Sequence, residues 1–239
     1  MKEYYRAYED RYQRVYAAGG KQWGHKPEDQ ELCDTLTGWV KAQNLCGKKV
    51  AEFACGEGAS GVILSKLGCI YDGFDISPSA LNTANKLLQP YPNAHARMLD
   101  MVKEIAYYDY YDAALDVMGF HMLITDEDRA RYLRNVFESL KPGAPVLFFK
   151  ESYSEDAHPG SVSSMEEWQK ISGTDYETPQ PRTVEGTDIT VMLPLLPARA
   201  RNKEDYIKEF TEAGFIVDDF VGFDYQGIYY SAAIYAHKP

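Results

Sequence analysis

The sequence predicts an α/β protein with a mostly parallel sheet that is covered by helices. Two observations carry this prediction. From residue 49 to residue 151, short apolar segments of strand length alternate with segments whose apolar residues recur at helical spacing. The chain has 239 residues, 45% of them hydrophobic and 26% charged, which is typical of a globular domain. Such alternation favours a parallel sheet, because each helix returns the chain to the edge where the next strand begins.

Five strands are expected in this alternating region. They cover residues 49–54, 71–77, 95–100, 112–118 and 145–151. Ser77 and Pro78 predict a helix start after the second strand, since serine at the N-cap and proline in the first turn both favour one. Thr125 and Asp128 indicate another helix start before the fifth strand.

The whole chain is predicted to form a single domain with four segments. They are a helical cap (1–45), an α/β core (46–151), an inserted lid (152–201) and a C-terminal helix with a hairpin (202–239). The insertion is rich in Ser, Pro, Gly, Asp and Thr and is too long for a plain connection, so we expect it to cover the active site. Asn202 and Gly214 bound the last helix, and a short turn makes the two strands after it antiparallel.

Charge and residue spacing exclude several classes of protein. The net charge of −11 argues against a nucleic-acid partner, which needs clustered Lys and Arg. No C-x-x-C, H-x-x-x-H or H-E-x-x-H occurs, so no metal site is expected. No apolar run approaches the roughly 20 residues that span a bilayer, and the N-terminus does not read as a secretory signal. We therefore expect a cytoplasmic monomer or homodimer without a membrane partner.

A glycine-rich turn after the first predicted strand is the best candidate for a binding site. Ala54, Gly56 and Gly58 let the backbone turn sharply and let a ligand approach the main chain. The turn lies at the carboxyl end of a parallel strand, where open α/β sheets bind their ligands. Gly56, Gly58 and Gly61 also fit G-x-G-x-x-G, which equally suggests NAD or FAD, or a tight turn without a ligand.

Four carboxylates near successive strand ends narrow this choice. Asp75 can accept both hydroxyls of a ribose, and Asp100 can accept the exocyclic amine of adenine. Glu52 and Asp116 would repel a pyrophosphate but suit an amino group or another positive charge. The set favours a nucleoside with a cationic tail, and a dinucleotide-dependent oxidoreductase stays as an alternative.

The segments that carry these residues resemble the successive motifs of class I S-adenosylmethionine-dependent methyltransferases. They are VAEFACGEGASG, GFDISPSAL, MLDM and DAALDVMGFHML, followed by LKPG. The resemblance implies a Rossmann-like, seven-stranded, mostly parallel sheet with helices on both faces and one antiparallel C-terminal strand. It also implies S-adenosylmethionine as cofactor, S-adenosylhomocysteine as product, and in-line methyl transfer to an O, N or S atom of a small molecule. A catalytically silent cofactor-binding protein of this fold is a second alternative.

The resemblance assigns the methionine half of the cofactor to the first turn, at Glu52, Ala54, Gly56 and Gly58. Asp116 and its neighbouring backbone would face the sulfonium and the amino group. Ala54 departs from the family, which usually has glycine there, and should narrow the turn while still permitting it.

The nucleoside half is assigned by the same resemblance to the next two strand ends. Asp75 would bind the ribose, Ile76 would lie against the adenine, and Asp100 and Met101 would frame its ring. The N-terminal stretch RYQRVYAAGGKQWGHKPEDQEL is similar to the thiol, halide and tellurite arm of the family. In that arm a leading tryptophan packs near the cofactor, which assigns Trp23 to this role.

Two histidines are candidates for a general base, which is needed only where the nucleophile is protonated. His121 is the first, because it follows the fourth strand, where this family often faces its substrate, and imidazole takes up protons near neutral pH. His25 is the second and requires the N-terminal segment to fold over the pocket. An aromatic and acidic lid favours a small acceptor that is apolar or cationic.

Overall fold

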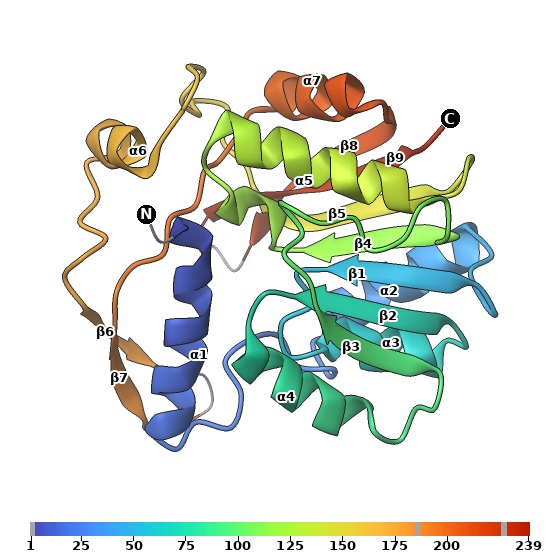
Figure 1. The fold of residues 1–239 in the computed structure, drawn as a ribbon, viewed down its shortest axis with the longest axis horizontal. Coiled ribbons are helices and arrows are strands. Elements are labelled where there is room, and N and C mark those ends of the chain that lie inside the picture. The colour runs from blue at the N-terminus through green and yellow to red at the C-terminus, as the bar shows by residue number, and fades with distance from the viewer. Residues whose placement is uncertain (1–2, 185–186, 226–228) are drawn as a thin grey trace.

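The computed structural model describes residues 3–184, 187–225 and 229–239. Its centre is a seven-stranded sheet with the order β3-β2-β1-β4-β5-β9-β8 (Figure 1). The strands are β1 (Lys49–Phe53), β2 (Ile70–Asp75), β3 (Ala94–Met98), β4 (Ala113–Val117), β5 (Pro145–Ser152), β8 (Ile216–Tyr225) and β9 (Tyr229–His237). β1 to β5 pair in parallel, and β9 pairs antiparallel with β5 and β8. This confirms the predicted Rossmann-like sheet with one reversed strand. The predicted turn between β8 and β9 includes residues 226–228, which lie outside the described residues.

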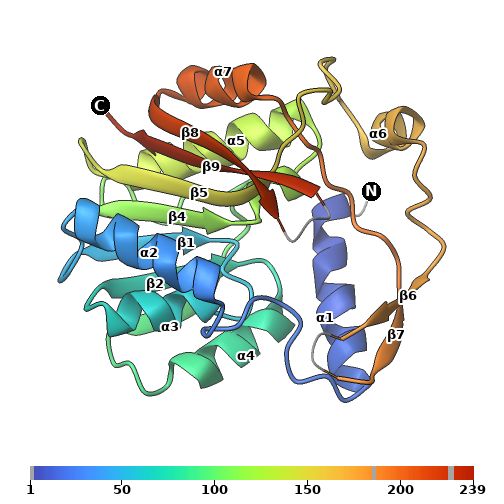
Figure 2. The ribbon, with the colours of Figure 1, turned by 180° about the vertical axis from the view of Figure 1, so that it is seen from behind.

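Helices cover both faces of this sheet (Figures 1 and 2). They are α2 (Gln30–Ala42), α3 (Ala59–Lys66) and α4 (Pro78–Leu88) on one face, and α5 (Asp126–Ser139) and α7 (Lys203–Ala213) on the other. Val50 of β1 packs into the core under α2 to α4, with Leu36 and Leu81. The next residue, Ala51, packs into the core under α5 and α7, with Phe210. Successive strand residues alternate between faces, so β1 needs apolar residues on both sides.

Side-chain caps start the helices where the sequence predicts. Ser77 Oγ accepts a hydrogen bond from the Ala80 backbone N–H at 3.1 Å, and Thr125 Oγ1 accepts one from Asp128 at 3.2 Å. Asn202 caps α7 in the same way, with Asp205 N at 2.8 Å. These bonds satisfy backbone donors that a helix leaves without an internal partner.

The N-terminal segment lies across the carboxyl ends of the strands. It contains the 3₁₀ turn η1 (Tyr4–Arg6) and the helix α1 (Ala7–Ala17). Helix α1 lies beside the carboxyl ends of the strands (Figure 1). Glu9 of α1 accepts hydrogen bonds from the Ser77 hydroxyl at 2.5 Å and the Ser79 amide at 3.1 Å. This carboxylate meets the N-terminus of α4, where the helix dipole favours negative charge.

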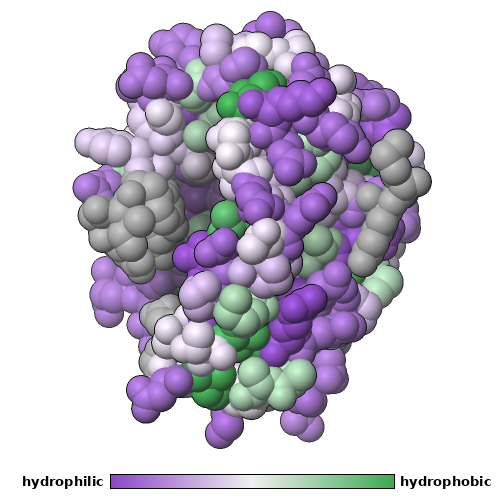
Figure 3. All heavy atoms as spheres, turned by 90° about the vertical axis from the view of Figure 1, so that its left-hand side faces the viewer, coloured by the Kyte–Doolittle hydropathy of each residue, from purple (hydrophilic) through white to green (hydrophobic). Residues whose placement is uncertain are grey.

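The segment 152–201 packs against the outer side of α1. It contains α6 (Met165–Ser172) and the antiparallel pair β6 (Gln180–Thr183) and β7 (Thr190–Leu193). Val15 of α1 forms a small core with Val191 and Leu193. The outer face that α1 and this segment share is largely hydrophilic (Figure 3). The insertion thus supports the helix that lies over the strand ends.

Among the described residues, no helix is long and apolar enough to cross a membrane. A cytoplasmic location, and a monomeric or homodimeric state, stay predictions.

Candidate cofactor and active site

The turn after β1 has an unusual backbone that brings its main chain to the sheet edge. Ala54, Gly56 and Gly58 have φ angles of 58°, 51° and 82°. A side chain on Gly58 would lie 3.1 Å from the Ala84 Cβ atom, so glycine lets α3 and α4 pack closely. Ala54 holds a left-handed conformation that costs a residue other than glycine about 1–2 kcal/mol. The alanine therefore permits the turn, as predicted, at the cost of local strain.

Two adjoining cavities lie between this turn and α1. The larger has a volume of about 320 Å³ and the smaller about 100 Å³. Both are lined by Tyr8, Tyr12, Ala54, Asp75, Met118 and Met122. Predicted residues that line the larger cavity are Trp23, Glu52, Ala54, Gly56 and Asp75. Those that line the smaller are Ala54, Asp75, Ile76, Asp100 and Met101. No described residue of the segment 152–201 is among the lining residues of either cavity, so the predicted lid does not line them.

Asp75 lies where the two cavities meet, and the backbone holds its carboxylate in place. Its Oδ2 accepts a hydrogen bond from the Gly56 amide at 2.8 Å, and Oδ1 accepts one from the Ser77 amide at 2.8 Å. Burial raises the pKa of Asp75, while these amides oppose the rise. The carboxylate thus links the glycine turn to the start of α4.

Glu52 is buried at the floor of the larger cavity. Its Oε2 accepts a hydrogen bond from the Tyr71 hydroxyl, and its side chain is 2% exposed. Burial raises the pKa of Glu52 to about 8, although hydrogen bonds from Tyr71 and Ser60 lower it. A cationic group in the cavity would favour the ionised carboxylate.

Asp100 and Asp116 differ in their access to the cavities. Asp100 lines the smaller cavity, and its Oδ2 lies 2.6 Å from Arg6 Nη2. Asp116 is fully buried, and its Oδ1 accepts the Gly119 amide at 2.7 Å, while Tyr132 donates its hydroxyl to Oδ2. Burial, together with the charge of Glu151, raises the pKa of Asp116 well above its usual value. Asp116 is not among the residues that line the two cavities, and its hydrogen bonds hold the turn after β4, so its contact with the cofactor stays a prediction.

His121 also lies behind the cavity wall. Its Nδ1 is 3.0 Å from Glu151 Oε2, and its backbone amide donates to the same oxygen at 2.7 Å. The residue is 4% exposed, and burial lowers the pKa of His121 to about 4. It lines neither cavity. The role of His121 as a general base therefore stays a prediction, and the lining of the cavities does not support it.

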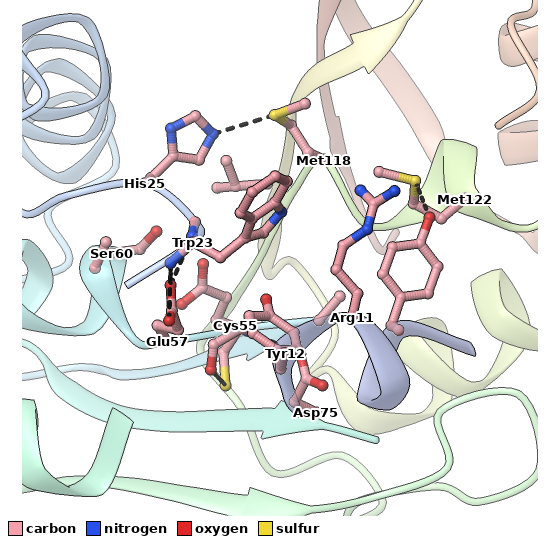
Figure 4. Close-up of a pocket in the computed structure, with 17 residues that line it drawn as sticks. Arg11, Tyr12, Trp23, His25, Cys55, Glu57, Ser60, Asp75, Met118 and Met122 are labelled. Carbon is pink, nitrogen blue, oxygen red and sulfur yellow. Dashed lines mark hydrogen bonds between the residues drawn. The ribbon is translucent and has the colours of Figure 1, made fainter. Parts of the chain in front are cut away.

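His25 lines the larger cavity instead. Its Nδ1 lies 3.1 Å from Asp29 Oδ2, and its Nε2 lies 3.1 Å from the Met118 sulfur at the cavity wall (Figure 4). Asp29 is itself fixed, because its Oδ1 caps α2 at Leu32 N and Lys150 Nζ lies 3.3 Å from its Oδ2. The N-terminal segment does fold over the pocket, as the second-choice base requires.

Glu57 fastens this N-terminal segment to the glycine turn. It is 3% exposed and accepts hydrogen bonds from the Trp23 amide at 2.9 Å and the Gly24 amide at 2.6 Å. The Tyr16 hydroxyl of α1 donates to it as well. These bonds hold Trp23 at the cavity (Figure 4), and its contact with the cofactor stays a prediction.

Sequence reasoning missed Glu57 and three lining residues of α1. Tyr8, Arg11 and Tyr12 line the larger cavity from one side of the helix. Their spacing of three and four residues puts them on one helix face, which is a signal that the sequence contains. The sequence does not show which part of the folded protein that helix face contacts.

Residues 50–143 match the family model of the methyltransferase domain. No curated protein sequence matches the chain. The fold is similar to that of a SAM-dependent methyltransferase from Clostridium acetobutylicum, with a TM-score of 0.65 and 14% identity over 98% of both chains. It is also similar to one from Methanosarcina mazei, with a TM-score of 0.62 and 16% identity over 83% of this chain and 96% of that one.

A TehB-like SAM-dependent methyltransferase from Corynebacterium glutamicum has a TM-score of 0.57 and 15% identity, over 97% of this chain and 96% of that one. At these identities the likeness shows a shared fold. The family match covers the glycine turn and the strand ends that line the cavities. Residues 50–143 therefore form a class I S-adenosylmethionine-dependent methyltransferase domain, whose cofactor is S-adenosylmethionine and whose product from it is S-adenosylhomocysteine.

Proposed function

We propose that this enzyme methylates a protic nucleophile on a small-molecule acceptor by in-line displacement. One observation carries the proposal: His25 lines the same cavity as Ala54 and Gly56 of the glycine turn, and its Nε2 lies 3.1 Å from the Met118 sulfur. A cavity of about 320 Å³ suits a small ligand and not a macromolecular segment. The net charge of −11 further disfavours a nucleic-acid acceptor.

The residues around the two cavities fit the parts of the cofactor. Ile76 and Met101 give the smaller cavity apolar walls for the adenine, with the Asp100 carboxylate at its edge. Asp75, at the junction, would accept the ribose hydroxyls. Glu52 offers a carboxylate to the amino group at the floor of the larger cavity.

The methionine half would lie along the turn at Ala54 and Gly56, with the Trp23 ring beside it. An aromatic face near a sulfonium contributes about 0.5–2 kcal/mol by cation–π attraction. Gly58 would act indirectly, since it lets α3 and α4 approach each other, and Asp116 would hold the turn after β4.

S-adenosylmethionine supplies a methyl group that is already activated for displacement from sulfur. The enzyme must therefore chiefly align the acceptor with that group, which can contribute roughly 7–11 kcal/mol. His25 would take the proton of the nucleophile on Nε2, because its Nδ1 faces Asp29 and its Nε2 lies beside Met118, which lines the cavity. The acceptor atom is then a hydroxyl, thiol or amine.

Ligand binding separates this proposal from a dinucleotide-dependent oxidoreductase. Thermal unfolding should show stabilisation by S-adenosylhomocysteine, about 2.7 kcal/mol at a hundredfold excess over Kd. Stabilisation by NAD alone would contradict the proposal and favour an oxidoreductase.

A screen of thiols, phenols and amines with a labelled methyl donor then tests transfer. Product from at least one class is the expected result. Cofactor binding without product from any class would favour the catalytically silent alternative.

A further inference from the structure

Arg11 brings a positive charge to the wall of the larger cavity that faces the glycine turn. It extends from α1, and its guanidinium lies between Trp23 and Met122 (Figure 4). The guanidinium carbon is 5.5 Å from the centroid of the Trp23 ring. Nη2 donates to the Pro194 carbonyl at 3.1 Å. Nε is buried and has no hydrogen-bond partner in the described part of the chain.

The buried arginines elsewhere in the fold have carboxylate partners. Arg129 lies 2.7 Å from Glu209, and Arg199 lies 2.6 Å from Asp126. The hydrogen bond of Arg11, in contrast, goes to a neutral carbonyl. Within residues 3–184, 187–225 and 229–239, no carboxylate forms an ion pair with it.

The charged groups near Arg11 do not balance its positive charge either. Burial lowers the pKa of Arg11, and the nearby Arg182 lowers it further, while Tyr8 and Tyr12 oppose the shift. A partly buried cation without a counter-charge is unfavourable. A bound anion would remove that cost.

We propose that Arg11 binds a carboxylate of a ligand inside the larger cavity. The inference rests on the proposed function, because the ligand is one of the two reactants. The planar guanidinium matches a carboxylate with two parallel N–H···O bonds, which suits a group with unused donors.

Two reactants can supply this carboxylate, and the chemistry at Arg11 is the same for both. One is an anionic acceptor, which would replace the apolar or cationic acceptor that the acidic sequence favours. The other is the α-carboxylate of the cofactor. In either case a carboxyl group and a guanidinium line the same cavity, with Glu52 on the turn side and Arg11 on the helix side.

The test measures the preference of the full-length protein for a ligand with a carboxylate over the matching compound without one. In one arm, calorimetry compares S-adenosylhomocysteine with S-adenosyl-3-thiopropylamine, which lacks only the carboxylate. In the other arm, benzoate and benzamide are titrated into the protein with and without S-adenosylhomocysteine. The variants are Arg11→Met and Arg11→Lys, with Arg14→Met as control, because Arg14 is an exposed arginine of the same helix.

In one arm, the wild type should bind the compound with the carboxylate about tenfold or more tightly than its partner compound. That arm shows whether the cofactor or the acceptor supplies the carboxylate. Arg11→Met should remove the preference without weakening binding of the compound that lacks the carboxylate. Arg11→Lys should keep part of the preference, and Arg14→Met should behave as wild type. Equal wild-type affinity for both members of each pair, or an unchanged preference in Arg11→Met, would overturn the inference. Failure of the proposed function appears separately, as wild-type protein that binds no S-adenosylhomocysteine or transfers no methyl group.

Discussion

The two walls of the larger cavity are built in different ways. The sheet wall consists of Glu52, Ala54, Gly56 and Asp75, which follow or end parallel strands. The helix wall consists of Tyr8, Arg11, Tyr12, Trp23 and His25, from α1 and the segment after it. Strand pairing fixes the sheet wall, since β1 lies between β2 and β4. The helix wall depends on contacts between distant segments, through the carboxylates of Glu9 and Glu57.

The two walls therefore offer different chemical groups to a ligand. The sheet wall offers backbone and carboxylates that suit a cofactor common to a family, whereas the helix wall offers the aromatic, cationic and imidazole groups that suit one acceptor. Variants of the two walls should therefore affect different measurements.

The largest effect is expected at His25, on the helix wall. His25→Gln should lower kcat by about 10²–10⁴-fold for a hydroxyl or amine acceptor, because the proton loses its base. Affinity for S-adenosylhomocysteine should stay near that of the wild type. Steady-state kinetics and calorimetry measure the two quantities.

His95→Gln is the matched control, since His95 is exposed on β3. Raising the pH should partly restore His25→Gln, because the nucleophile then ionises without help. Wild-type turnover in His25→Gln at neutral pH would remove His25 from the mechanism.

Glu57→Ala should release the helix wall from the sheet wall. The Trp23 and Gly24 amides lose their buried acceptor, so the free energy of unfolding should fall by about 2–4 kcal/mol. Hydrogen exchange should accelerate at these two amides more than in the sheet. Glu28→Ala, at an exposed position in the same segment, should change neither quantity. Unaltered exchange at Trp23 would mean that other contacts hold the segment.

Glu52 predicts opposite pH dependences for stability and for ligand binding. Burial raises the pKa of Glu52 from 4.5 to about 8 in the unliganded protein. Its contribution to stability is therefore full below pH 4.5 and is lost as the pH rises to about 8. An ammonium group favours the ionised carboxylate, so affinity for S-adenosylhomocysteine should rise by up to about tenfold per pH unit below that value.

Denaturant titration across this pH range measures how the free energy of unfolding changes with pH. Calorimetry measures how the affinity for S-adenosylhomocysteine changes with pH. Glu52→Gln should abolish the Glu52 contribution to both, while the raised pKa values of Asp116 and Glu151 remain in the variant. The same slopes in Glu52→Gln would assign the effect to those other carboxyl groups.

The smallest effect is expected at Ala54, on the sheet wall. Ala54→Gly relieves a left-handed strain of about 1–2 kcal/mol and adds about 0.5–1 kcal/mol of backbone entropy cost. Stability should thus rise by about 1 kcal/mol or less in denaturant titrations. Ala130→Gly, exposed within α5, should destabilise instead, because its conformation is helical. A loss of stability in Ala54→Gly would show that packing of its methyl group outweighs the strain.

The sequence by itself determined the α/β class, the helix starts and the sheet wall. Each depends on local information: apolar periodicity for strands and helices, side-chain caps at Ser77 and Thr125, and glycines at Gly56 and Gly58. Parallel topology then brings the carboxyl ends of the strands to one edge, so their polar residues converge.

Only the tertiary structure decided which side chains face the cavity. Met118 has a φ angle of 62°, and the 3₁₀ turn η2 (Phe120–Met122) follows it. This backbone directs Met122 into the cavity, while its neighbour His121 packs against Glu151. Sequence spacing cannot resolve that one-residue difference, because it depends on backbone angles that the surrounding core imposes.

The same limit applies to the segments outside the α/β core. The insertion 152–201 packs against α1 and lines neither cavity, and Arg11 reaches the larger cavity without a carboxylate partner among the described residues. Both outcomes depend on how a helix face and a long connection dock onto a finished sheet. Docking is governed by contacts between residues far apart in the chain, and periodicity records only which face is apolar, not what it meets.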